Sequence, residues 1–109
     1  MNYTTIRIAD NDYNLRFGMA SFRYLADKNI ENFDEIGISH IIYSGYYNWC
    51  LVNEVLPVLK FVEVVDFVES SLQSDMTEVN NVMKVWGDNQ LLKDATDTKK
   101  KTTGKRSKK

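Results

Sequence analysis

The spacing of apolar residues changes at Gly18, and this change limits which elements the chain can form. Before Gly18, apolar and polar residues alternate, which places the apolar ones on one face of extended strands. The polar residues 9–12 interrupt this alternation with Asp and Asn, residues that favour turns. Residues 4–17 therefore predict a β-hairpin, and because two strands alone are marginally stable, its apolar face is expected to pack on the rest of the chain. The alternating apolar residues are Ile6, Ile8, Tyr13, Leu15 and Phe17.

After Gly18 the apolar spacing becomes helical. A first helix is expected up to Lys28, with Asn29 as a favourable residue after its end. Asp34 can cap a second helix that runs to about Asn53, ahead of the break at Pro57.

A third helix is expected from about residue 60, and a fourth after residue 75. The third has an apolar stripe with a spacing nearer to 3.6 than to 2, which favours a helix over a short strand at 61–68. Asp75 and Glu78 resemble a capping box for the fourth helix, and Gly87 is expected to end it. The two stripes are Phe61, Val64, Val65, Val68 and Leu72, and then Val79, Val82, Met83 and Trp86.

These patterns together predict an α+β fold, in which an N-terminal β-hairpin packs on a bundle of about four helices. We expect one globular domain over residues 1–93 and a disordered basic tail over 94–109. Residues 99–109 carry seven of the 14 Lys and Arg and no apolar residue, while all 15 Asp and Glu lie before them. The acidic body disfavours nucleic-acid binding by the tail. The basic tail residues are Lys99, Lys100, Lys101, Lys105, Arg106, Lys108 and Lys109.

The sequence contains no constellation of catalytic or metal-binding residues. There is one His, His40, and one Cys, Cys50, and no glycine-rich phosphate loop or metalloprotease motif. We therefore expect no enzymatic activity, no cofactor and no metal. No segment is long and apolar enough to span a membrane, and no secretory signal is present, which favours a soluble intracellular protein.

The second helix is apolar on two sides. One side is an ordinary core stripe and the opposite side carries tyrosines. The stripe residues are Ile38, Ile41, Ile42, Gly45, Trp49 and Val52. Such a helix is either central in the domain or covered by a partner, and both interpretations stay open at this point. Tyrosine is favoured at interfaces because its ring buries apolar area and its hydroxyl keeps a polar contact. The candidate partner-binding residues are Tyr43, Tyr46, Tyr47 and Cys50.

Three segments resemble the tail assembly chaperones of siphophages. The opening DNDYNLRFGMASFRYLADK, with Tyr13, Leu15, Arg16, Phe17, Gly18, Met19 and Leu25, is similar to their strand–turn–helix start. IIYSGYYNWCLV resembles their second helix, and PVLKFVEVVDFVESSL, with Phe61, Glu63, Val64 and Asp66, resembles their third. The resemblance covers roughly residues 3–72.

The resemblance implies a non-enzymatic chaperone that keeps the tape measure protein soluble and helps to recruit tail tube subunits. It implies a location in the host cytoplasm and absence from the mature virion. The family often makes a longer product by ribosomal frameshifting, and Lys99–Lys101 could lie at such a site.

Two other functions compete: a small nucleic-acid-associated adaptor that uses the basic tail, and a structural head–tail or minor tail protein. Self-association is also expected, since an exposed Tyr face and an open sheet edge are both liabilities for a monomer.

Overall fold

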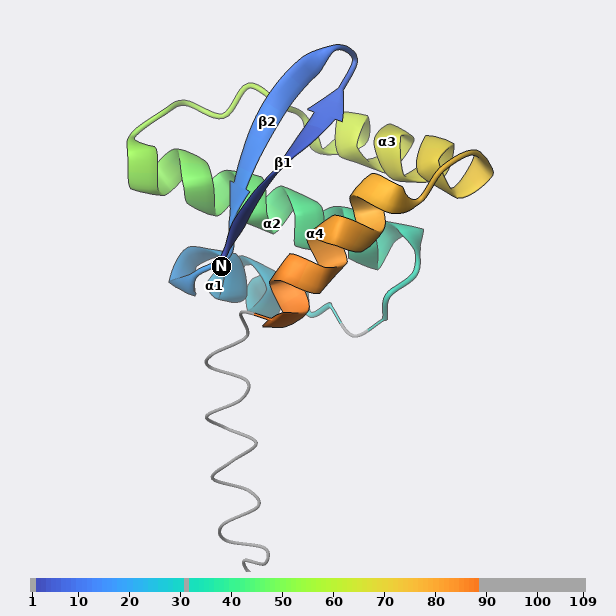
Figure 1. Cartoon of the computed structure of the whole chain (residues 1–109). Coiled ribbons are helices and arrows are strands. Elements are labelled where there is room, and N and C mark those ends of the chain that lie inside the picture. Colours follow the sequence, from blue (N-terminus) through green and yellow to red (C-terminus); the bar gives the residue numbers. More distant parts are fainter. Residues whose placement is uncertain (1, 31, 89–109) are drawn as a thin grey trace, which may run out of the picture.

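The computed structural model describes residues 2–30 and 32–88, and it contains the expected hairpin and four helices in the expected order (Figure 1). The predicted domain end at residue 93 and the predicted tail at 94–109, with its seven basic residues, lie outside the described residues. The elements are β1 (Tyr3–Ile8), β2 (Asn11–Arg16), α1 (Met19–Lys28), α2 (Glu35–Asn53), α3 (Phe61–Gln73) and α4 (Thr77–Asp88).

The two strands pair antiparallel around a turn that is shorter than the polar run suggested. Ile8 pairs with Asn11, so only Ala9 and Asp10 form the turn, and both have positive φ, at 50° and 66°. Positive φ at both central residues is the geometry of a type I′ turn, whose twist matches that of the flanking strands. The side-chain amide of Asn11 donates to the Ala9 carbonyl at 3.3 Å.

The apolar face of the hairpin packs on α2, as expected from the alternation. Ile6, Leu15 and Phe17 are buried there. The contact is close because Gly45 has no side chain: a Cβ at this position would lie 2.7 Å from Cε1 of Phe17. At the end of β2, the side-chain amide of Asn48 donates to the Arg16 carbonyl at 2.7 Å.

Helix α2 is the central element of the fold. It packs against β2, α1, α3 and α4, and the hairpin crosses in front of it in Figure 1. Ile41, Ile42 and Ser44 are fully buried, and the Ser44 hydroxyl donates to the carbonyl of Ile41 at 2.6 Å. Of the two interpretations of its two apolar sides, the central position is the one that the structure shows.

The ends of α1 and α2 follow the predicted capping residues. Asn29 adopts the left-handed conformation after α1, with φ 57°. A carboxylate oxygen of Asp34 accepts a hydrogen bond from the Gly37 amide at 2.8 Å at the start of α2. These short polar side chains provide hydrogen bonds or conformations that a helix end needs.

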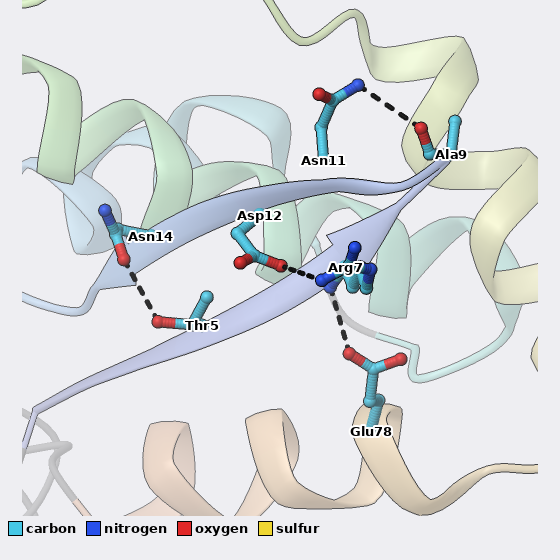
Figure 2. A network of polar contacts seen from close by, with 7 residues as sticks. All are labelled: Thr5, Arg7, Ala9, Asn11, Asp12, Asn14 and Glu78. Carbon is cyan, nitrogen blue, oxygen red and sulfur yellow. Dashed lines mark hydrogen bonds and ion pairs between the residues drawn. The ribbon is translucent and has the colours of Figure 1, made fainter.

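Three details of α3 and α4 differ from the sequence prediction. Leu72 is 51% exposed, because the buried stripe of α3 continues from Val68 to Ser71. Only half of the expected capping box forms at the start of α4: the Asp75 carboxylate accepts a hydrogen bond from the Thr77 amide at 3.0 Å, whereas Glu78 accepts one from the Arg7 amide of β1 at 2.9 Å (Figure 2). Gly87 lies within α4 and does not end it.

Candidate protein-binding surface

The end of α2 and the loop after it expose apolar side chains that have no place in the core. Leu56 is 84% exposed and Val58 is 74% exposed. Both lie well inside the described range 32–88, so fraying of a chain end does not explain their exposure. Single exposed apolar residues are normal, but a cluster of them is typical of an interaction site. We call this cluster the loop patch, and its residues are Leu51, Val52, Val55, Leu56 and Val58. The prediction that Val52 belongs to the core stripe of α2 is wrong, because Val52 lies in the last turn of the helix and is 53% exposed.

The loop is held in place by the hydroxyl of Tyr46. This oxygen accepts hydrogen bonds from the amides of Val58, at 2.7 Å, and Leu59, at 3.1 Å. Leu59 is buried in the core and anchors the loop there, whereas Leu56 and Val58 are exposed to solvent. The loop residues of the patch, Val55, Leu56 and Val58, therefore belong to a segment that a core tyrosine holds at its end.

A groove of about 530 Å³ lies next to the loop patch, between α1 and α2. Tyr24 of α1 and Tyr43 and Tyr47 of α2 contribute its aromatic part, and Leu51 and Pro57 connect it to a second hollow in the loop. Charged residues of α1 complete the lining. They are Arg23, Asp27 and Lys28.

The tyrosines of the groove form one aromatic cluster. The ring centroid of Tyr24 lies 5.9 Å from that of Tyr43 and 6.1 Å from that of Tyr47. Burial, with a smaller contribution from Tyr43, raises the pKa of Tyr24 to about 12, and burial also raises the pKa of Tyr43. All three rings are half-buried, so the groove is apolar with hydroxyls available for hydrogen bonds.

His40 lies beside this cluster. Its Nδ1 is 2.9 Å from the Tyr24 hydroxyl, and its ring stacks on Phe61 with a centroid distance of 4.3 Å. Burial, and then the charge of Lys28, lowers the pKa of His40. These contacts join α1, α2 and α3, which gives the imidazole a structural role in supporting the groove.

Two of the four predicted partner-binding residues are in the wrong environment for that role. Tyr46 is 3% exposed and Cys50 is 2% exposed, so the prediction that they contribute to an accessible face is wrong. The reason is that β2 and the loop cover this side of α2, with Tyr13 in edge contact with the Tyr46 ring at 5.7 Å. Tyr43 and Tyr47 are half-buried and do line the groove.

Sequence reasoning missed the loop patch and Tyr24. The signal for the patch was present in the run EVLPVLK, where apolar residues surround a proline in a segment too short for a helix of its own. Tyr24 could not be assigned from the sequence, because only the packing of α1 on α2 brings it to Tyr43 and Tyr47.

Within residues 2–30 and 32–88, no group of three or more His, Cys, Asp or Glu is placed to hold a metal ion. None of the helices described is long and apolar enough to cross a membrane. Comparisons with protein-family models, curated proteins and solved structures found no match for this chain.

Proposed function

We propose that this chain is a non-enzymatic tail assembly chaperone of a siphophage. It binds and solubilises the tape measure protein, helps to recruit tail tube subunits, acts in the host cytoplasm and is absent from the mature virion. Two things support the proposal: the resemblance of residues 3–72 to this family, and the exposed loop patch beside an aromatic groove. The loop patch is the observation on which the proposal depends most, since it needs a cover that the described part of the chain does not supply.

The shape of the surface suits an apolar helix. A helix presents anchors at positions i, i+3, i+4 and i+7 along one stripe, and a hydrophobic groove is the usual receptor for such a stripe. The groove offers aromatic area from Tyr24 and Tyr47, and the loop patch extends it past Leu51. A tape measure protein is a long helical chain whose apolar stripes need cover before the tail tube forms around it.

Charges along α1 provide contacts for the polar flanks of such a helix. Arg23 and Lys28 are exposed cations, and Asp27 is an exposed carboxylate between them. Exposed ion pairs contribute little binding free energy, so these residues set the orientation of the bound helix. Burial of apolar surface provides most of the affinity for that helix.

The test is co-expression with a siphophage tape measure protein, followed by affinity purification. The double variant Leu56→Ser/Val58→Ser removes the two most exposed residues of the loop patch. Because both side chains are mostly in solvent, its melting temperature is expected to stay within a few degrees of the unchanged chain. The partner is expected to be soluble with the unchanged chain and to be lost, by about tenfold or more, with this variant.

A matched control is Tyr3→Ser/Leu72→Ser, which removes two exposed apolar residues outside the loop patch. This control is expected to retain the partner. The complex is also expected to survive high salt, because apolar contacts are not screened. A complex that falls apart steeply with salt would instead indicate a contact through the basic tail, and recovery of the protein in purified particles would indicate a structural virion component.

A further inference from the structure

The hairpin register determines which main-chain groups are free to pair with another strand. Ile8 and Asn11 flank a two-residue turn and therefore exchange main-chain hydrogen bonds, as do Ile6 and Tyr13. The residues between them point their N–H and C=O groups away from the hairpin. Two contacts support this assignment: the Arg7 amide donates outward to Glu78, and the Arg16 carbonyl accepts from Asn48.

The two edges of the hairpin are protected differently. Helix α4 packs against β1, and Glu78 accepts the outward hydrogen bond of Arg7 (Figure 2). On β2, the outward carbonyl of Arg16 is already bonded to Asn48. Among residues 2–30 and 32–88, no acceptor is found for the outward amides of Asp12 and Asn14, and both residues are exposed. An open edge of this kind is a template for another strand.

We propose that β2 pairs with β2 of a second copy of this chain, antiparallel, around a two-fold axis at Tyr13. The interface joins the two hairpins into one four-stranded sheet. In this register Asp12 of each copy lies opposite Asn14 of the other, and the pair exchanges both main-chain hydrogen bonds. The inference is independent of the proposed function.

The free groups select this register over its neighbour. Pairing centred on Asn14 would place Asp12 opposite Arg16 and would require the Arg16 carbonyl, which Asn48 occupies. Pairing centred on Tyr13 can proceed with the unbonded groups of Asp12 and Asn14 alone.

The side chains fit a second copy better than an unrelated strand. Within its own hairpin, the Asp12 carboxylate accepts from Arg7 through Oδ1 and the Asn14 carboxamide accepts from Thr5 through its oxygen. The other Asp12 oxygen and the NH2 group of Asn14 remain, so across the two-fold axis an acceptor of one copy faces a donor of the other. Tyr13, half-buried on the core-facing side, meets its own counterpart.

The first test measures the mass of the full chain by size-exclusion chromatography with light scattering over a concentration series. Asn14→Pro removes one outward amide of β2 and is tolerated by an edge strand. Thr5→Pro is the matched control, because Thr5 pairs with Asn14 and its amide points outward on β1. Both variants also lose the same side-chain contact, between Thr5 Oγ1 and Asn14 Oδ1 at 3.0 Å.

The unchanged chain and Thr5→Pro are expected to form a dimer, and Asn14→Pro is expected to raise the dissociation constant of the dimer by about tenfold or more. Melting temperatures of the two variants should fall by similar amounts, which separates loss of pairing from loss of folding. A monomer at all concentrations for the unchanged chain, or equal dimerisation of both variants, would overturn the proposal.

A crosslink tests the register directly. At a non-hydrogen-bonded antiparallel pair the two Cα atoms are about 4.5 Å apart, within the range that a disulfide spans. Tyr13→Cys is therefore expected to give a disulfide-linked dimer on mild oxidation. Thr5→Cys, on the other strand, should give none, and the buried Cys50 of the unchanged chain should also give none. Equal crosslinking of Tyr13→Cys and Thr5→Cys would contradict the register.

Discussion

Gly45 is the residue that lets the hairpin approach α2. An alanine there would place its Cβ 2.7 Å from Cε1 and 2.9 Å from Cζ of the buried Phe17 ring. Real structures do not contain such contacts, so the hairpin would have to move away from the helix and lose packing. The small residue thus controls the depth of the core between the two layers.

Gly45→Ala is expected to lower the free energy of unfolding by about 1–3 kcal/mol, the usual cost of overpacking a core. Gly87→Ala is the control, because nothing lies within 4 Å of a Cβ at this position of α4. Because alanine has a higher helix propensity than glycine, Gly87→Ala is expected to leave the free energy of unfolding unchanged or to raise it by up to about 1 kcal/mol. Urea denaturation measures both, and equal effects of the two substitutions would contradict the close approach.

His40 connects stability to pH. Burial and the neighbouring Lys28 lower its pKa from the ordinary value of 6.5, so the folded state favours the neutral imidazole and protonation favours the unfolded state. His40 therefore makes its full contribution to the free energy of unfolding above pH 6.5. This contribution is lost as the pH falls through the lower pKa that His40 has in the folded state.

The expected result is a decrease in unfolding free energy on acidification below pH 6.5, starting before most carboxylates titrate. His40→Gln, which keeps a polar group near Tyr24, should reduce this dependence. Urea denaturation at a series of pH values measures the effect, and an NMR titration of the His40 ring gives its pKa. A His40 pKa at or above 6.5 would be inconsistent with the burial described here.

At the scale of elements, α2 ends in a motif that normally contains glycine. Glu54 has φ 56°, and the amide of Val55 donates back to the Cys50 carbonyl at 2.9 Å. This is the Schellman pattern, in which a left-handed residue closes the helix. A glutamate in this conformation carries a steric cost that glycine does not have. The same turn directs the chain into the loop patch.

Glu54→Gly is expected to raise the free energy of unfolding by about 0.5–1 kcal/mol, because the strain of the left-handed residue is removed. Asn29→Gly, at the equivalent position after α1, should change stability less, since asparagine tolerates this conformation. Thermal or urea denaturation of both variants checks the comparison. A destabilised Glu54→Gly would mean that the glutamate side chain makes a contribution larger than its strain.

At the scale of the whole molecule, Tyr43 and Tyr47 have different roles: the first supports the fold and the second lines the proposed binding surface. Tyr43 contacts rings on the two neighbouring helices, with centroids 5.9 Å from Tyr24 of α1 and 6.0 Å from Phe61 of α3, so it belongs to the framework. Tyr47 has a ring contact with Tyr24 and lines both the groove and the hollow of the loop. The two tyrosines were equivalent on the helical wheel, and the packing makes them different.

Tyr43→Ser is expected to lower the unfolding free energy by roughly 1–3 kcal/mol, through lost aromatic packing. Tyr47→Ser should cost less than half of that and should weaken binding of the proposed helical partner. Denaturation and co-purification of each single variant measure the two effects. Loss of binding with Tyr43→Ser alone, at unchanged stability, would reverse the roles assigned to these residues.

Much of the fold could be predicted because local physics produces it. Alternation in residues 4–17, helical spacing after Gly18, and capping by Asn29 and Asp34 are properties of short segments, and each appears in the structure. The prediction failed where a distant segment competes for a side chain. Glu78 was expected to cap its own helix, but its carboxylate bonds to Arg7, 71 residues away in the chain.

The sequence alone therefore determined the order and type of the elements, since periodicity and caps act over a few residues. Only the tertiary structure decided which side of each element is covered. It buried Tyr46 and Cys50 under β2 and the loop, left Leu56 and Val58 in solvent, and brought Tyr24 to Tyr47 across two helices. The physical reason is that burial depends on which surfaces meet, and an amphipathic pattern does not specify its partner.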